Sequence, residues 1–144
     1  MKLYIINGPN LNMLGVREPD IYGKEDYATL TEMVGGRCAE LGVECTIYQS
    51  NHEGDLVDKI QEAYREGAFG IVINPAAYTH TSVALLDAVK AVGLPTVEVH
   101  ISNVMEREAF RHHSFVAPIA QKTYMGLGFE GYRRAVRYLV LGEE

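Results

Sequence analysis

The sequence predicts a doubly wound α/β domain, in which a parallel sheet of five strands in the order 2-1-3-4-5 is covered by helices on both faces. Short runs rich in apolar and β-branched residues alternate along the chain with stretches of helical spacing. The connections between them are short, which favours parallel strands joined by helical crossovers. The chain has 144 residues and no internal repeat or linker, so we expect residues 1–144 to form one domain.

Four apolar runs predict the first four strands, and a weaker run predicts the fifth. The four runs cover residues 3–6, 43–48, 71–73 and 96–99. The fifth strand is expected at residues 116–119. Five strands alternating with helices in a chain of this length are typical of the flavodoxin-like arrangement.

The segments between the strands carry apolar residues at every third or fourth position, as amphipathic helices do. This spacing predicts helices over residues 27–41, 56–64 and 83–90, and a last helix over about residues 128–141. A glycine stands just beyond each of the first three, where a left-handed residue commonly ends a helix. These glycines are Gly42, Gly67 and Gly93.

Composition excludes several classes of partner. Thirteen Lys and Arg against nineteen Asp and Glu give a net charge of −6, which argues against nucleic acid because its phosphates repel a negative chain. No apolar run approaches the roughly 20 residues of a membrane span, and the first apolar run ends at Asn7, too early for a signal peptide. Cys38 and Cys45 form no recognisable pair motif, so we expect a cytoplasmic protein with reduced thiols.

A polar residue follows each of the first four predicted strands: Asn7, Gln49, Asn74 and His100. A single asparagine at a strand end is usually a turn former. Four polar strand ends, however, meet at the carboxyl edge of a parallel sheet, where open α/β folds bind their ligands. The sequence therefore predicts a ligand site at this edge.

Residues 15–24 form a long polar loop that carries Arg17 and Tyr22. One interpretation is a solvated arginine and a surface tyrosine. The other is that Arg17 lowers the pKa of Tyr22 from its ordinary value of about 10 and favours a tyrosinate base. Long loops in compact domains are commonly functional, and we expect this one to close over His100.

Glu98 and His100 lie two residues apart in the predicted fourth strand, so their side chains point to the same side. The carboxylate can then orient the imidazole and hold it charged, which is an arrangement for a general acid. The alternative is a structural ion pair at the sheet edge. Arg107 and Arg111 follow with a spacing of four, which predicts one helical face that either is solvated or supplies positive charge for a carboxylate substrate.

Residues 74–82 lead from the third strand into a helix. Thr79, Thr81 or Ser82 is a candidate cap for that helix. His80 is either a hydrogen-bonded structural residue or, beside Asn74, part of a site for a hydroxylated ligand.

Other chemistries find no support in the sequence. The Gly-x-Gly-x-x-Gly spacing at residues 126–131 is followed by only thirteen residues, which leaves no room for a dinucleotide-binding unit. His112 and His113 are adjacent and make a poor metal site. No lysine falls at the carboxyl end of a predicted strand, so an imine-forming lysine is not expected.

Taken together, the motifs resemble those of the type II 3-dehydroquinases over nearly the whole chain. In chain order they are INGPNLN (residues 6–12), REP with YG (17–19 and 22–23), QSNHEG (49–54), NPAAYTHTS (74–82), VEVHISN (97–103) and FRH (110–112). The resemblance implies a flavodoxin-like subunit that dehydrates 3-dehydroquinate to 3-dehydroshikimate, in the shikimate or quinate pathway, with no metal or organic cofactor.

The resemblance also assigns catalytic roles. Tyr22 is implied to be the base that removes a proton from C2, with Arg17 keeping it ionised. Asn10 is implied to hold a water that stabilises the enolate. His100, oriented by Glu98, is implied to protonate the hydroxyl that leaves C1.

Further positions match the family's substrate-binding residues: Asn74, His80, Ile101, Ser102 and Arg111. Asp87 matches an acidic residue that the family contributes from a neighbouring subunit, in trimers that usually assemble into dodecamers. Leu86 stands where many members carry arginine. The alternative from another class is a non-catalytic module that binds a polyhydroxy acid or a mononucleotide at the same edge; it would need Asn74 and His80 but not the proposed acid and base.

Overall fold

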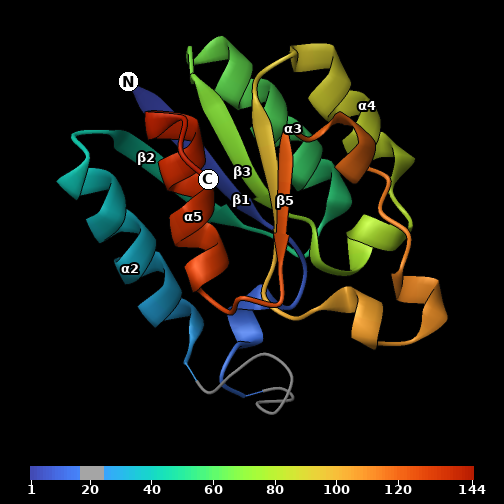
Figure 1. Cartoon of the computed structure of the whole chain (residues 1–144). Coiled ribbons are helices and arrows are strands. Elements are labelled where there is room, and N and C mark those ends of the chain that lie inside the picture. The colour runs from blue at the N-terminus through green and yellow to red at the C-terminus, as the bar shows by residue number, and fades with distance from the viewer. Residues whose placement is uncertain (17–24) are drawn as a thin grey trace.

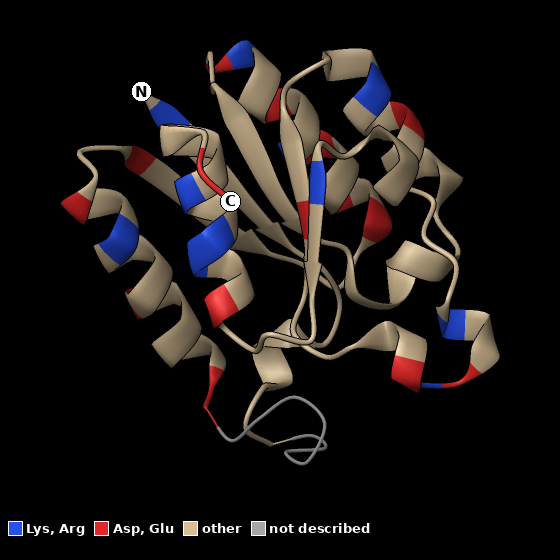
Figure 2. Cartoon of the chain, viewed as in Figure 1, with Lys and Arg blue, Asp and Glu red and all other residues tan. Residues whose placement is uncertain are grey.

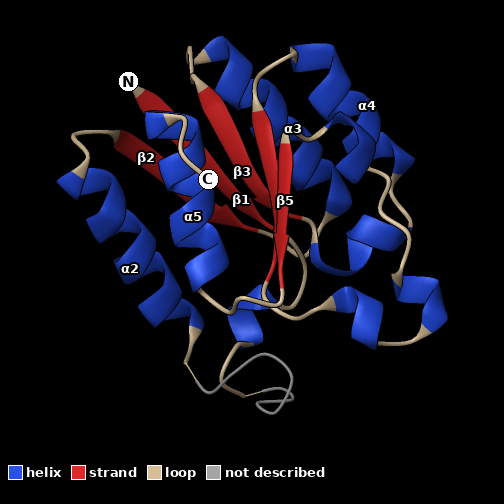
Figure 3. Ribbon diagram, in the orientation of Figure 1, coloured by secondary structure: helices blue, strands red, loops and turns tan. Residues whose placement is uncertain are grey.

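Five parallel strands form a single sheet in the order β2-β1-β3-β4-β5 in a computed structural model that describes residues 1–16 and 25–144. The strands are β1 (Lys2–Asn7), β2 (Glu44–Gln49), β3 (Gly70–Asn74), β4 (Thr96–His100) and β5 (Lys122–Met125). This is the flavodoxin-like order that the sequence predicts (Figure 3).

In the part of the chain that the structure describes, four α-helices cover the two faces of the sheet (Figure 1). They are α2 (Tyr27–Glu40), α3 (Glu53–Arg65), α4 (Val83–Val92) and α5 (Glu130–Leu141). Helices α2 and α5 pack against each other on one face, and α3 and α4 pack against each other on the opposite face. None of the helices within the described ranges is long and apolar enough to cross a membrane.

The alternation of side chains along β1 shows how the sheet supplies two cores. Leu3 and Ile5 are fully buried in the core beneath α2 and α5. Tyr4 and Ile6 are buried in the core beneath α3 and α4. Because both faces are covered, the first strand is apolar at every position from Leu3 to Ile6, which is why it reads as a continuous run.

The predicted fifth strand is wrong. Residues 117–119 form a short 3-10 helix, η5 (Ala117–Ile119), and the strand lies three residues later at β5. Pro118 has no N–H with which to join a ladder, and Val116 is buried in the core of α3 and α4 instead. β5 was overlooked because it lies at the edge of the sheet, where Lys122 and Thr123 hide the apolar pattern.

The helix ends follow the sequence closely. Gly42, Gly67 and Gly93 adopt the left-handed conformation expected of them, with φ of 70°, 71° and 64°. Of the three candidate caps for α4, Ser82 is the one whose hydroxyl accepts the N–H of Leu85, at 3.0 Å. The last helix begins at Glu130 rather than at residue 128, because Gly128 has a positive φ of 59° that a helix does not contain.

The backbones of the first and third strands are in close contact just beyond their ends. The N–H of Gly8 donates to the carbonyl of Asn74 at 2.8 Å. A Cβ atom at Gly8 would lie 2.4 Å from the carbonyl oxygen of Pro75, a backbone atom that cannot move aside cheaply. Only glycine fits here, and this contact fixes how the two loops that follow the strands approach each other.

We expect Gly8→Ala to lower the free energy of unfolding by about 1–3 kcal/mol or more, because the new methyl group overlaps backbone. The matched control is Gly36→Ala in the middle of α2, where a Cβ meets nothing within 4 Å and alanine should stabilise by about 0.5–1 kcal/mol. Urea unfolding midpoints at one protein concentration measure both changes. A midpoint for Gly8→Ala equal to that of the unmodified chain would contradict the steric argument.

Candidate active site

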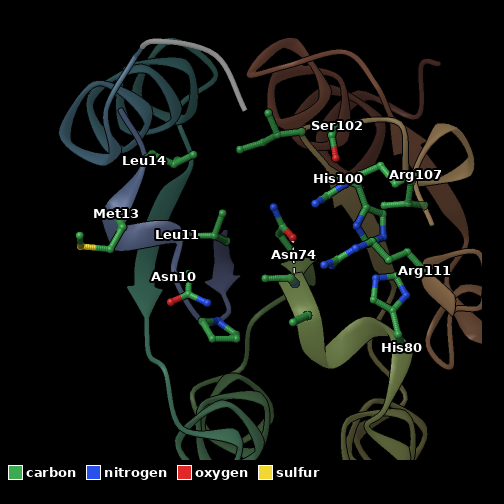
Figure 4. A pocket seen from close by; sticks show the side chains of 15 residues that line it. Asn10, Leu11, Met13, Leu14, Asn74, His80, His100, Ser102, Arg107 and Arg111 are labelled. Carbon is green, nitrogen blue, oxygen red and sulfur yellow. Dashed lines mark hydrogen bonds between the residues drawn. The ribbon is translucent and has the colours of Figure 1, made fainter. Parts of the chain in front are cut away.

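A cleft opens at the carboxyl edge of the sheet, where the segments that follow β1, β3 and β4 meet (Figure 4). Counted out to its open mouth, it encloses about 720 Å³. It lies beside the point where the strand order reverses between β1 and β3. Open α/β sheets bind their ligands at this position, and the cleft lies at the edge where the sequence predicts a ligand site.

Strand β4 brings Glu98 and His100 together as the alternation of side chains predicts. The Nε2 atom of His100 lies 2.7 Å from Oε2 of Glu98, and both residues are buried, with 5% and 0% of their surfaces exposed. An ionised carboxylate only accepts hydrogen bonds, so Nε2 carries a proton. His100 lines the cleft, and its other ring nitrogen, Nδ1, is the one that remains available to a ligand there.

Ser114 is a site residue that the sequence analysis missed. Its hydroxyl lies 2.8 Å from Oε1 and 3.1 Å from Oε2 of Glu98, and donates to the carboxylate. It reaches Glu98 from a segment 16 residues farther along the chain. A serine in an irregular segment carries no periodic signal, and only the fold shows which group it contacts.

Asn74 is held in place by a chain of buried hydrogen bonds. Its Nδ2 donates to the hydroxyl of Tyr132 at 2.9 Å, and that hydroxyl donates to Oδ1 of Asn7 at 2.6 Å. Burial raises the pKa of Tyr132 far above its ordinary value of 10, so the phenol stays neutral. Tyr132 lies 58 residues beyond Asn74, in α5, and was also missed by the sequence analysis.

Two residues that line the cleft have left-handed backbone: Asn10, with φ of 70°, and Ala76, with φ of 53°. Asparagine tolerates this conformation, but alanine is strained in it. The strain at Ala76 is opposed by a hydrogen bond from its N–H to Oδ1 of Asn74, at 3.0 Å. Strained backbone of this kind concentrates at functional sites.

Asn10 faces the cleft from the side opposite His80 (Figure 4). Its backbone N–H donates to Oδ1 of Asn51 at 3.0 Å. Gln49, at the end of β2, donates to the same oxygen and to the carbonyl of Gly8, each at 3.1 Å. Gln49 therefore supports the loop that presents Asn10, whereas the sequence suggested only that it lies at the same edge.

The two predicted arginines line the cleft, but they do not share a helix as their spacing suggested. Arg107 has extended backbone between two short 3-10 helices, η3 (Val104–Glu106) and η4 (Ala109–Arg111), and Arg111 ends the second. The spacing of four requires a continuous α-helix, which single turns do not provide. Both guanidinium groups approach Glu108, at 3.8 and 3.1 Å from Oε1, and they form a cationic wall.

His80 lies against this wall. Its Nδ1 is 2.8 Å from the carbonyl of His113, and a carbonyl only accepts, so Nδ1 carries the proton. Burial lowers the pKa of His80 below its ordinary value of 6.5, and the charges of His100 and Arg111 lower it further, against the opposing effect of the bond to His113. His80 is thus neutral at pH 7, with Nε2 able to accept a hydrogen bond.

The remaining predicted site residues divide into three groups. Ile101 and Ser102 line the cleft. Asp87 is exposed on α4 and is not among the described residues that line it. Arg17 and Tyr22, and with them the expected closure of the loop, lie outside the described residues. Within residues 1–16 and 25–144, no cluster of three or more His, Cys, Asp or Glu is arranged to hold a metal ion.

Charge is distributed unevenly around this cleft. Figure 2 shows acidic and basic residues interspersed on the outer helices. The wall of the cleft carries Arg107 and Arg111 together with two histidines, while Glu98 is buried behind His100. Such a wall suits a small anion, and arginine pairs well with a carboxylate in particular.

Comparison with known proteins identifies the family. A family model described as dehydroquinase class II matches residues 1–140. The 3-dehydroquinate dehydratase of Cereibacter sphaeroides is 56% identical over 135 residues, which cover 94% of this chain and 91% of that protein. The enzyme of the same name from Bordetella avium is 51% identical over 138 residues and covers 96% of both chains.

Solved structures agree with the sequence comparison. The crystal structure of type II dehydroquinase from Butyrivibrio crossotus superposes with a TM-score of 0.95 at 52% identity, covering 96% of this chain and 97% of that one. The chain therefore belongs to the class II dehydroquinase family, as its motifs indicated.

The environment of His80 predicts its titration. We expect the midpoint of His80 to lie below 6.5, and Arg111→Gln to raise it because one nearby positive charge is removed. The folded chain binds this proton less readily than the unfolded chain does. The free energy of unfolding should therefore fall as the pH drops from about 6.5 toward the lower pKa that His80 has in the folded chain. NMR titration of the histidine ring protons measures the midpoint.

The control is Arg134→Gln, on the exposed surface of α5, which should leave the titration midpoint of His80 unchanged. A midpoint at or above 6.5 in the unmodified chain would contradict this account.

Proposed function

We propose that this chain is a 3-dehydroquinate dehydratase that eliminates water across C1 and C2 of its substrate to give 3-dehydroshikimate. Its membership of the dehydroquinase class II family and the names of its relatives support the substrate. The observation that carries the reaction type is the buried pair of Glu98 and His100 at the edge of a cleft with a cationic wall. Burying a carboxylate costs free energy, and a catalytic role for the pair would explain why the carboxylate lies there.

The substrate carboxylate is proposed to bind Arg107 and Arg111. Both guanidinium groups line the cleft on the same side as His100 (Figure 4). A planar guanidinium can donate two parallel hydrogen bonds to a carboxylate, which fixes orientation as well as charge. With the carboxylate on this wall, C1, which carries both the carboxylate and the leaving hydroxyl, is close to His100.

His100 is proposed to protonate that hydroxyl as it leaves. A hydroxide ion is a poor leaving group, and a positioned general acid commonly accelerates such a step by about 10²–10⁴-fold. Glu98 holds Nε2 and stabilises the imidazolium form, so that the proton on Nδ1 is available for transfer into the cleft. His100 thereby becomes neutral at the moment when water departs.

The proton on C2 is proposed to go to Tyr22, with Arg17 keeping the phenol ionised. These two residues match the family's motif and lie outside the described part of the chain. Removing a proton next to the ketone places negative charge on the carbonyl oxygen, which needs a donor aimed at it. Asn10, whose side chain lines the cleft, is proposed to hold a water that supplies this hydrogen bond.

The remaining hydroxyl groups are proposed to be bound by Asn74, His80, Ile101 and Ser102. Neutral His80 can accept a hydrogen bond from a substrate hydroxyl, because its Nδ1 is engaged with the carbonyl of His113. Asp87 is exposed on α4, which suits the proposal that it serves the site of a neighbouring subunit in a trimer, with trimers assembling into a dodecamer. We further propose that the enzyme acts in the cytoplasm.

A non-catalytic module for a polyhydroxy acid or a mononucleotide is the alternative function. Such a module would use Asn74 and His80 but would gain nothing from a buried carboxylate behind a histidine. Purified protein mixed with 3-dehydroquinate should develop the ultraviolet absorbance of a conjugated enone. Binding of the compound without any absorbance change would instead favour the module.

We expect Tyr22→Phe to lower kcat by about 10²–10⁴-fold, because phenylalanine keeps the ring and removes only the group that accepts the proton. The control is Tyr64→Phe, which changes an exposed tyrosine of α3 in the same way and should leave kcat unaltered. Circular dichroism confirms that both variants fold. Turnover of Tyr22→Phe near that of the unmodified enzyme would remove Tyr22 from the mechanism.

A further inference from the structure

Glu98 is a fully buried carboxylate whose two oxygens need hydrogen-bond donors. One donor is His100, through Nε2 to Oε2 at 2.7 Å. The other is Ser114, whose hydroxyl lies 2.8 Å from Oε1 and 3.1 Å from Oε2. Without Ser114, Oε1 would lose the only hydrogen bond found for it among the described residues.

The hydroxyl of Ser114 is itself held in a fixed direction. The N–H of Ala117 donates to it at 3.1 Å. The hydroxyl accepts this bond through one of its lone pairs, so its single hydrogen remains available to donate to Glu98. The order of donation therefore runs from the backbone of η5 through Ser114 to the carboxylate, and His100 binds the same carboxylate from the other side.

We propose that Ser114 is a positioning residue that keeps Glu98 ionised and correctly oriented, and thereby holds His100 in place as the general acid. A buried carboxylate that loses a donor either takes up a proton or admits water. In both cases it holds the Nε2 proton of His100 less firmly. The effect on turnover rests on the proposed function, whereas the effect on the Nε2 proton does not.

A purely structural role for Ser114 makes a different prediction. If its hydroxyl served only to accept the N–H of Ala117, its loss would resemble the loss of any cap and would lower stability without changing kcat. Ser82 provides the comparison, because its hydroxyl accepts the N–H of Leu85, also three residues farther on. Ser82 is buried, and it is not among the described residues that line the cleft.

The experiment compares Ser114→Ala, Ser114→Thr and Ser82→Ala. For Ser114→Ala we expect kcat to fall about 10–100-fold, as when a metal-ligating side chain loses the partner that orients it, while KM changes less than about threefold. Ser114→Thr keeps the hydroxyl and should restore most of kcat. Ser82→Ala should lose stability but keep kcat. Ser114→Cys, with a weak donor of similar shape, replaces Ser114→Ala if that variant does not fold.

Proton NMR of the free protein tests the same inference without any substrate. The Nε2 proton of His100, bound to a buried carboxylate, should give a downfield resonance that exchanges slowly with water, and Ser114→Ala should speed its exchange at least tenfold. If the unmodified protein has no dehydratase activity but this exchange behaves as expected, the proposed function fails and the role of Ser114 stands. The role is overturned if Ser114→Ala leaves exchange and kcat unchanged, or if Ser82→Ala lowers kcat as much.

Discussion

The close contact between Gly8 and Pro75 is the constraint on which the candidate site depends. It lies where β1 and β3 end side by side, with Asn7 level with Asn74 across the ladder. Because no side chain separates the two loops there, each can turn away from the sheet at once. One loop presents Asn10 and the other His80, so the cleft opens between them. A site at this switch point is thus a consequence of how closely two backbones pack.

Two buried polar networks attach the cleft to the two faces of the sheet. On the face of α5, Tyr132 joins Asn7 to Asn74. On the face of α4, Ser114 supports Glu98 behind His100. Buried polar groups are costly unless they are paired, and once paired they allow few other arrangements. Each network therefore fixes one functional side chain, an amide in the first and an imidazole in the second, and residues behind the sheet, Tyr132 of α5 and Ser114, become part of the site.

Much of the fold and of the candidate site could be predicted from the sequence. The features that could not be predicted share one physical origin. Glu98 and His100 were paired correctly because strand alternation is a local rule. β5 was misplaced because an edge strand with Lys122 hides its pattern, and the arginines were given one helix because spacing does not distinguish an α-helix from two 3-10 turns. Ser114 and Tyr132 were missed altogether, since they contact their partners across 16 and 58 residues, and no local pattern encodes such contacts.

The chain as a whole is negatively charged, whereas the wall of its cleft carries two arginines. A long polyanion and a small carboxylate therefore meet different electrostatic environments. The net charge of −6 acts on a long polyanion, which must lie against acidic surface far from any one site. Within the cleft, charges more than about 8 Å away through solvent are largely screened at physiological ionic strength. A small carboxylate in the cleft is therefore influenced mainly by the nearest charges, which are those of Arg107 and Arg111 and of the two carboxylates beside the cleft wall, Glu108 and Glu98. The acidity of the whole chain therefore disfavours a long polyanion, but it leaves the cleft well suited to a single carboxylate.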